Sequence, residues 1–151
     1  MNLHLSEVII ERCDKETEDV ISSEQLEFLS TPLQHVKKHP NEFIYIESPT
    51  FDQIKVDAIS IELDDVFQTY TALLGLRMQK KYTAAIKNYF NENLIGENKY
   101  FSASFSGDEG IWDLNIPLDY IQGFSEEMTI GDALSLTYEF VRTLVKDIEQ
   151  Q

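Results

Sequence analysis

The sequence predicts an α+β domain in which helices pack on a small, mostly antiparallel sheet. Three observations support this prediction. A stretch around residue 108 alternates like a β-hairpin, two shorter runs are rich in β-branched and aromatic residues, and two longer segments place apolar residues at helical spacing. No repeat, linker or low-complexity tract interrupts the 151 residues, so we expect a single domain over residues 1–151.

The composition is that of a folded, acidic protein. Apolar residues make up 42% of the chain, which has nine Phe, seven Tyr and one Trp. The 27 Asp and Glu against 12 Lys and Arg give a net charge of −15, which repels phosphate backbones and anionic lipid surfaces. We therefore expect no nucleic acid and no membrane as partner. The single cysteine, Cys13, and the absence of a long apolar run or a basic leader predict a cytoplasmic location.

The first 40 residues combine an ambiguous start with a helical segment. Residues 1–21 fit strand, helix and loop in turn, so the pattern leaves their structure open. Residues 23–40 place apolar side chains at helical spacing, with Ser23 as the N-cap and Pro40 as the stop. Pro32 is the point at which this segment can divide into two short helices.

Two β-rich runs follow. Residues 43–47 have the length and composition of a strand. Residues 54–61 alternate with a slip in register after Asp57, as a bulged strand does, but they also fit the start of the helix that follows. We interpret them as a strand, because Ile59 and Ile61 are β-branched and a helix extended to include them would be unusually long.

Residues 64–93 are predicted to form a long helix. Asp64 and Asp65 suit its positive N-terminal end. Gly75 in its middle, at a cost of about 1 kcal/mol relative to Ala, indicates a kink or a close helix contact. The apolar residues recur every three or four positions and share a broad face: Val66, Tyr70, Leu73, Leu74, Met78, Ala85, Ile86, Tyr89 and Phe90.

Residues 100–116 are predicted to form a hairpin with a four-residue loop at 107–110, because this loop opposes odd positions of one strand to even positions of the other and so brings their apolar faces together. Glycines in the loop supply positive φ angles and Asp108 is a common turn former, so the tip is interpreted as a turn. The register pairs Phe105 with Trp112, Ala103 with Leu114 and Phe101 with Ile116.

The C-terminal segment is predicted to be a helix over residues 130–149. Thr129 is its N-cap, and Asp132 reaches back to the cap in the manner of a capping box. Apolar residues recur along the segment at helical spacing, so one face is expected to be buried.

No arrangement of residues predicts catalysis. His35 and His39 are four apart, but no Glu follows His35 as in a zinc-binding helix, and Pro40 crowds the second imidazole. Cys13 stands between opposite charges without the signature of a nucleophile. Phosphate-binding loops, nucleophile elbows and calcium loops are also absent from the sequence. We therefore expect no catalytic residue, no metal and no cofactor.

The charge and the lack of catalytic motifs favour a non-enzymatic module that holds a basic protein, as inhibitors, immunity proteins and chaperones do. The alternative is a small-molecule-binding protein or enzyme with a pocket between the helix at 64–93 and the hairpin, near Trp112. The sequence leaves the oligomeric state open. The candidate partner-binding residues are those on the polar face of the hairpin, Tyr100, Ser102, Ser104, Asp113 and Asn115, and those at its tip, Asp108 and Glu109.

Overall fold

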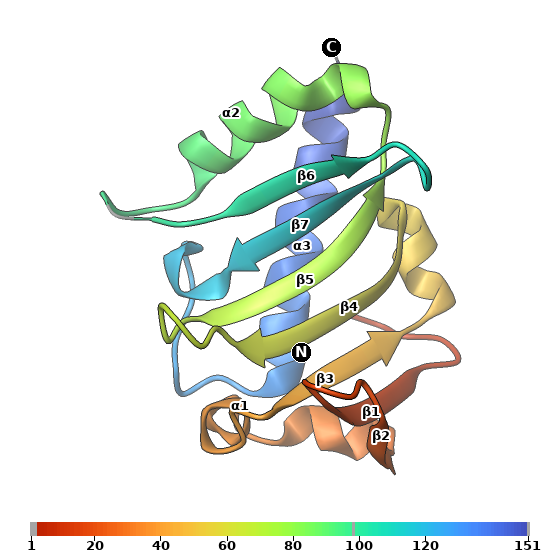
Figure 1. Cartoon of the computed structure of the whole chain (residues 1–151), viewed down its shortest axis with the longest axis vertical. Coiled ribbons are helices and arrows are strands. Elements are labelled where there is room, and N and C mark those ends of the chain that lie inside the picture. The colour runs from red at the N-terminus through yellow and green to blue at the C-terminus, as the bar shows by residue number, and fades with distance from the viewer. Residues whose placement is uncertain (1–2, 98, 151) are drawn as a thin grey trace.

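A seven-stranded antiparallel sheet forms the centre of the fold in this computed structural model, which describes residues 3–97 and 99–150 (Figure 1). The strands lie in the order β2-β1-β3-β4-β5-β7-β6, so β2 and β6 are the two edges. Their bounds are β1 (Ile9–Asp14), β2 (Val20–Glu24), β3 (Glu42–Glu47), β4 (Val56–Leu63), β5 (Tyr70–Arg77), β6 (Ser102–Ser106) and β7 (Ile111–Pro117).

The main helix, α3, runs behind the sheet in Figure 1, and no described helix crosses the front. We call the side facing α3 the covered face and the other side the open face. The remaining helices lie around the edges of the covered side. Their bounds are α1 (Gln34–Lys38), α2 (Thr83–Asn93) and α3 (Ile130–Glu149), with short 3-10 helices η1 (Leu26–Ser30), η2 (Pro49–Ile54), η3 (Lys80–Tyr82) and η4 (Leu118–Tyr120).

Strand register builds the core on the covered face. One row of directly paired residues crosses five neighbouring strands, and all of its members are at most 7% exposed: Ile10, Ile46, Ile59, Leu74 and Leu114. From the other side, α3 contributes Leu134, Val141 and Leu144, all fully buried. Since side chains alternate along a strand, the strand residues on either side of this row point to the open face.

The α+β class is confirmed, but the sheet is larger than the small one predicted. The ambiguous N-terminal residues supply β1 and β2, and Ser23 lies inside β2 instead of capping a helix. The predicted division near Pro32 is confirmed, since η1 and α1 lie on either side of it. The strand expected at 43–47 is β3, and the one expected at 54–61 is β4, shifted two residues along the chain.

The long helix predicted for residues 64–93 is wrong. Residues 70–77 form β5, and only the final third of the segment is helical, as α2. Because β5 is a central strand buried on both sides at its start, apolar residues are consecutive there and imitate helical spacing. Gly75 lies in this strand, where an added Cβ would be 2.9 Å from the Cδ1 atom of Ile111. Its place is explained by that side chain, not by a helix kink.

The acidic pair that suggested a helix start, Asp64 and Asp65, belongs to the loop between β4 and β5. The Asp64 carboxylate accepts hydrogen bonds from the backbone N–H of Val66 at 2.9 Å and of Phe67 at 2.7 Å. A short acidic side chain that binds backbone N–H groups two and three positions ahead stabilises a turn as well as it caps a helix. The sequence pattern alone therefore did not separate the two.

The hairpin and the C-terminal helix are as predicted. Phe105 pairs with Trp112 and Ala103 with Leu114, and α3 begins with a full capping box between Thr129 and Asp132. The third expected pair does not form, because β6 starts at Ser102, and the ring of Phe101 packs on Phe90 with centroids 4.9 Å apart. That pair was Phe101 with Ile116, one position beyond the last pair of the ladder, Ser102 with Asn115.

Three hairpin loops share one backbone conformation. The loops at residues 14–19, 64–69 and 106–111 each close with a hydrogen bond from the N–H of the fifth residue to the carbonyl of the first, at 2.8 to 2.9 Å. The fifth residue has a positive φ in each, namely 66° at Glu18, 56° at Gln68 and 68° at Gly110. In the predicted hairpin tip, Gly110 is therefore the glycine with positive φ, and Gly107 is not.

Candidate functional site

The open face is the one broad surface of the sheet that no described helix covers (Figure 1). Register places one row of residues straight across it, from the β2 edge to the β6 edge. The chemistry of the row changes along its length, from a hydroxyl and a carboxylate through aromatic, small and apolar side chains to an amide and a second hydroxyl. The members are Ser23, Glu11, Tyr45, Ser60, Leu73, Asn115 and Ser102.

Two neighbouring hollows indent this face, and both are lined by Ser60 and Leu73. They measure about 400 and 410 Å³. Small side chains at the centre of the face leave this space. The first hollow is lined by Lys15, Glu18, Phe43, Ser60, Glu62, Asp65 and Leu73, and the second by Ala58, Ser60, Leu73, Leu74, Asp113, Leu114 and Asn115.

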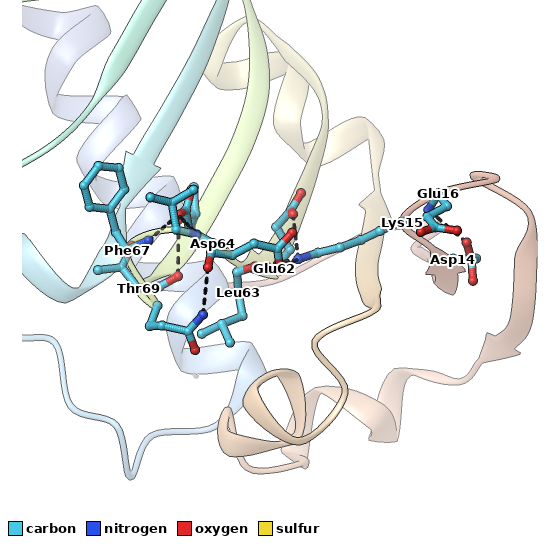
Figure 2. A network of polar contacts seen from close by, with 12 residues as sticks. Asp14, Lys15, Glu16, Glu62, Leu63, Asp64, Phe67 and Thr69 are labelled. Atoms are coloured by element: carbon cyan, nitrogen blue, oxygen red, sulfur yellow. Dashed lines mark hydrogen bonds and ion pairs between the residues drawn. The ribbon is translucent and has the colours of Figure 1, made fainter.

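The cations at the rim of the open face are already bound to the protein's own oxygens. The Nζ atom of Lys15 lies 2.6 Å from the carbonyl oxygen of Leu63 and 3.2 Å from a carboxylate oxygen of each of Glu62 and Asp65 (Figure 2). At the opposite end, Arg77 forms ion pairs with Asp57 and, at 3.4 Å, with Asp52.

The carboxylates of the open face outnumber these cations. Glu11, Glu47, Glu62 and Asp113 all occupy open-face positions, and Asp113 is exposed. The hydroxyl of Tyr45 donates to Glu47 at 2.9 Å, and burial together with this carboxylate raises the pKa of Tyr45 to about 12. Tyr45 therefore stays a neutral hydrogen-bond donor, and the face as a whole is negative.

An aromatic pair stands at one end of the open face. The rings of Phe67, from the β4–β5 loop, and Tyr100, just before β6, stack with centroids 4.4 Å apart and planes at 27°. Phe67 is 50% exposed and Tyr100 is 43% exposed. Stacked aromatic rings that keep this much surface in water are common at binding surfaces.

The structure brings five of the seven candidate residues onto one surface. Ser102, Ser104, Asp113 and Asn115 occupy the open face, and Tyr100 lies at its end. The other two, Asp108 and Glu109, are exposed in the β6–β7 loop at the opposite end of the hairpin.

Several open-face residues were absent from the candidate set. Glu11 was missed because the structure of residues 1–21 was left open. Tyr45 and Glu47 were missed although the alternation within residues 43–47 signals a two-sided strand. Phe67 was missed because it was assigned to a helix.

The histidine pair does not converge on a common point. The rings of His35 and His39 stack with centroids 4.1 Å apart, and Nδ1 of His39 donates to the carbonyl oxygen of His35 at 2.8 Å. Burial and the positive charge of His39 and Arg12 lower the pKa of His35. Among residues 3–97 and 99–150, no group of three His, Cys, Asp or Glu side chains is arranged to hold a metal ion.

Another hollow lies on the covered side and is not lined by Trp112. It measures about 680 Å³ and lies between the N-terminal segment, η2 and α3. Within the described chain, the Oγ atom of Ser135 is buried there without a hydrogen-bond partner, while the Tyr138 hydroxyl donates to Gln53 at 3.2 Å. The lining residues are Leu3, His4, Ser6, Thr50, Gln53, Asp132, Ser135, Tyr138 and Glu139.

Comparison with known proteins finds no family model, no curated protein and no solved structure that matches this chain. In the part of the chain that the structure describes, no helix combines the length and the apolar character needed to cross a membrane.

Proposed function

We propose that this protein is a non-enzymatic, cytoplasmic binding module that holds a basic protein partner against the open face of its sheet. One observation carries the proposal: the open face has more carboxylates than cations, and the cations at its rim, Lys15 and Arg77, are bound to acids of the same chain. The carboxylates Glu11, Glu47 and Asp113 are left to face a partner.

The chemistry of the face suits a protein more than a small anion or a nucleic acid. A half-buried apolar centre around Phe43 and Leu73 is surrounded by carboxylates, which is the usual layout of a protein interface with a desolvated core and a polar rim. The net charge of −15 accelerates encounter with a basic protein and repels anionic partners.

The test is affinity capture from the source cell's lysate with two charge-reversal variants. Glu11→Lys/Asp113→Lys changes the open face. Glu92→Lys/Asp147→Lys changes exposed positions on α2 and α3 and serves as the matched control, because both double variants alter the net charge by the same amount. We expect the wild type and the control to retain one basic protein stoichiometrically, and the open-face variant to lose it.

Salt provides the second readout. Binding through the open face should weaken steeply between low and moderate ionic strength, because exposed charges are screened within about 10 Å at 0.1 M salt. A partner that both variants retain equally, or whose binding is insensitive to salt, would contradict the proposal.

A second candidate is small-molecule binding in the hollow of about 680 Å³, whose volume is in the range of ligand pockets. The unpartnered Oγ atom of Ser135 favours it, since buried hydroxyls normally have a hydrogen-bond partner. A ligand screen by thermal shift on wild type and Ser135→Leu tests this candidate. A ligand that stabilises the wild type and not the variant would support it, and equal shifts would reject the site.

A further inference from the structure

We propose that the stacked rings of Phe67 and Tyr100 bind an arginine side chain of the basic partner. This inference rests on the proposed function, because it assigns to one end of the same surface a preference among basic side chains. It adds a chemical selectivity that charge alone does not give, since arginine and lysine carry the same charge.

The two rings form an exposed platform. Their centroids are 4.4 Å apart and the planes are inclined by 27°, so they lie nearly parallel. About half of each side chain is exposed. In Figure 2 the Phe67 ring projects away from the hydrogen bonds of its own loop.

Hydrogen bonds on both sides hold the platform in place before a partner arrives. The Asp64 carboxylate binds the backbone N–H of Phe67 at 2.7 Å, and the loop closes where the Asp64 N–H donates to the carbonyl of Thr69 at 2.8 Å. On the other side, Nζ of Lys99 donates to the carbonyl of Leu94 at 2.7 Å, next to Tyr100 in the chain. A platform that is already ordered loses less entropy on binding.

The charge around the platform favours a cation. Asp64 and Asp65 lie three and two positions before Phe67 in the loop, and the Asp65 side chain is 75% exposed although one of its oxygens pairs with Lys15 at 3.2 Å. A second copy of this chain, also at −15, would meet like charge at this surface.

Arginine fits this site better than lysine. Its guanidinium is planar, weakly hydrated and stacks on aromatic faces, whereas the lysine ammonium is a compact and strongly hydrated charge. An arginine that stacks on the outer face of either ring can keep its N–H groups directed at solvent or at carboxylates. We therefore expect selection of arginine at this end of the open face.

The experiment compares the affinities of hexa-arginine and hexa-lysine peptides by isothermal titration calorimetry at low salt. The two peptides have equal charge, so the ratio of their dissociation constants removes the non-specific electrostatic part. We expect hexa-arginine to bind the wild type about three- to fivefold more tightly. In Phe67→Leu/Tyr100→Leu, which keeps apolar bulk but has no aromatic face, the ratio should fall to about one.

Val66→Ala is the matched control, because Val66 is 79% exposed in the same loop and has no aromatic ring. It should keep the wild-type ratio. Thermal unfolding of each variant checks that the fold is intact, and the aromatic NMR signals of Phe67 and Tyr100 should shift on titration with hexa-arginine.

The outcomes separate this inference from the proposed function. Equal affinities of the wild type for both peptides, or an arginine preference that survives in the leucine double variant, would overturn arginine binding by the two rings. Neither result would bear on the acidic open face, which the charge-reversal variants test separately. Failure of both peptides to bind would also overturn the inference. The NMR signals of Phe67 and Tyr100 could shift with hexa-arginine while Glu11→Lys/Asp113→Lys still captures the basic partner. That result would support arginine binding by the two rings and reject the open face as the main binding surface.

Discussion

The Nζ atom of Lys15 lies 2.6 Å from the carbonyl oxygen of Leu63, so the loop that follows β1 is tied to the end of β4, two strands away (Figure 2). Glu62 and Asp65 each place a carboxylate oxygen 3.2 Å from the same ammonium group, and the Lys15 side chain is only 13% exposed. A largely buried cation with three oxygen partners holds this end of the sheet together.

Replacing Lys15 with Met should lower the free energy of unfolding by about 1–2 kcal/mol, because it removes a charge-assisted hydrogen bond and leaves two carboxylates side by side. Urea denaturation measures the change. Lys55→Met is the control, since Lys55 meets Glu149 at 3.9 Å with both side chains about half exposed, and a loss below about 0.5 kcal/mol is expected. Equal losses in the two variants would show that the contacts of Lys15 stabilise the fold no more than an exposed ion pair does.

The two glycines of the β6–β7 loop should respond to alanine with opposite signs. Gly110 has a φ of 68°, so Gly110→Ala should destabilise the protein by about 1 kcal/mol even though no atom lies within 4 Å of the added Cβ. Gly107 has no positive φ and the same open surroundings, so Gly107→Ala should stabilise by about 0.5 kcal/mol through the unfolded chain. Chemical denaturation of both variants checks the signs, and two changes of the same sign would refute this description of the loop.

The ion pair between Arg12 and Glu42 should be costly to break from one side. Both guanidinium contacts are 2.9 Å long and the Glu42 side chain is 9% exposed. Glu42→Gln should therefore destabilise by about 2–3 kcal/mol, because Arg12 loses its bidentate carboxylate and keeps only Glu24, at 3.7 Å, as a charged partner. In a double-mutant cycle, Arg12→Met/Glu42→Leu should cost less than the sum of Arg12→Met and Glu42→Leu made singly. Additive losses would mean that the two side chains act independently.

Stability should fall as the pH drops below neutrality because of His35. Its pKa is below the ordinary 6.5 in the folded protein, first because burial disfavours the imidazolium and then because His39 and Arg12 are positive. The unfolded chain takes up this proton at a higher pH than the folded one, so the contribution of His35 is complete above about pH 6.5 and is lost as the pH falls from there through the lower pKa of the folded protein.

Denaturation at several pH values between 7 and 5 tests this expectation. His35→Leu should flatten the dependence, since the buried Nε2 atom has no hydrogen-bond partner among the described residues and its removal leaves no donor unpaired. An unchanged slope in the variant would assign the dependence to another group.

The predictable parts of the fold were those that local pattern determines. The loop at residues 107–110 fixes which side chains oppose each other, so the pairing of Phe105 with Trp112 followed from counting residues. The cap at Thr129 also depends only on its neighbours. By contrast, Leu73 and Leu74 point to opposite faces of a central strand, and consecutive apolar residues carry no period that separates strand from helix.

The candidate surface was predictable to the same degree. Alternation within the hairpin placed Ser102, Ser104, Asp113 and Asn115 on one face. The alternation within the hairpin could not predict that Glu11 and Tyr45 lie on the same face, because their pairing depends on the long-range contact of β1 with β3. Phe67 meets Tyr100 only because residues 70–77 form a strand.

The position of α3 in the chain affects how the protein is made. The strands β1 to β5 leave the ribosome well before α3, yet α3 supplies Leu134, Val141 and Leu144 to the same apolar core as the covered face. During synthesis the open face is therefore compatible with water, whereas the covered face exposes apolar side chains until α3 is made. A nascent chain in this state is open to chaperones and to self-association until α3 docks.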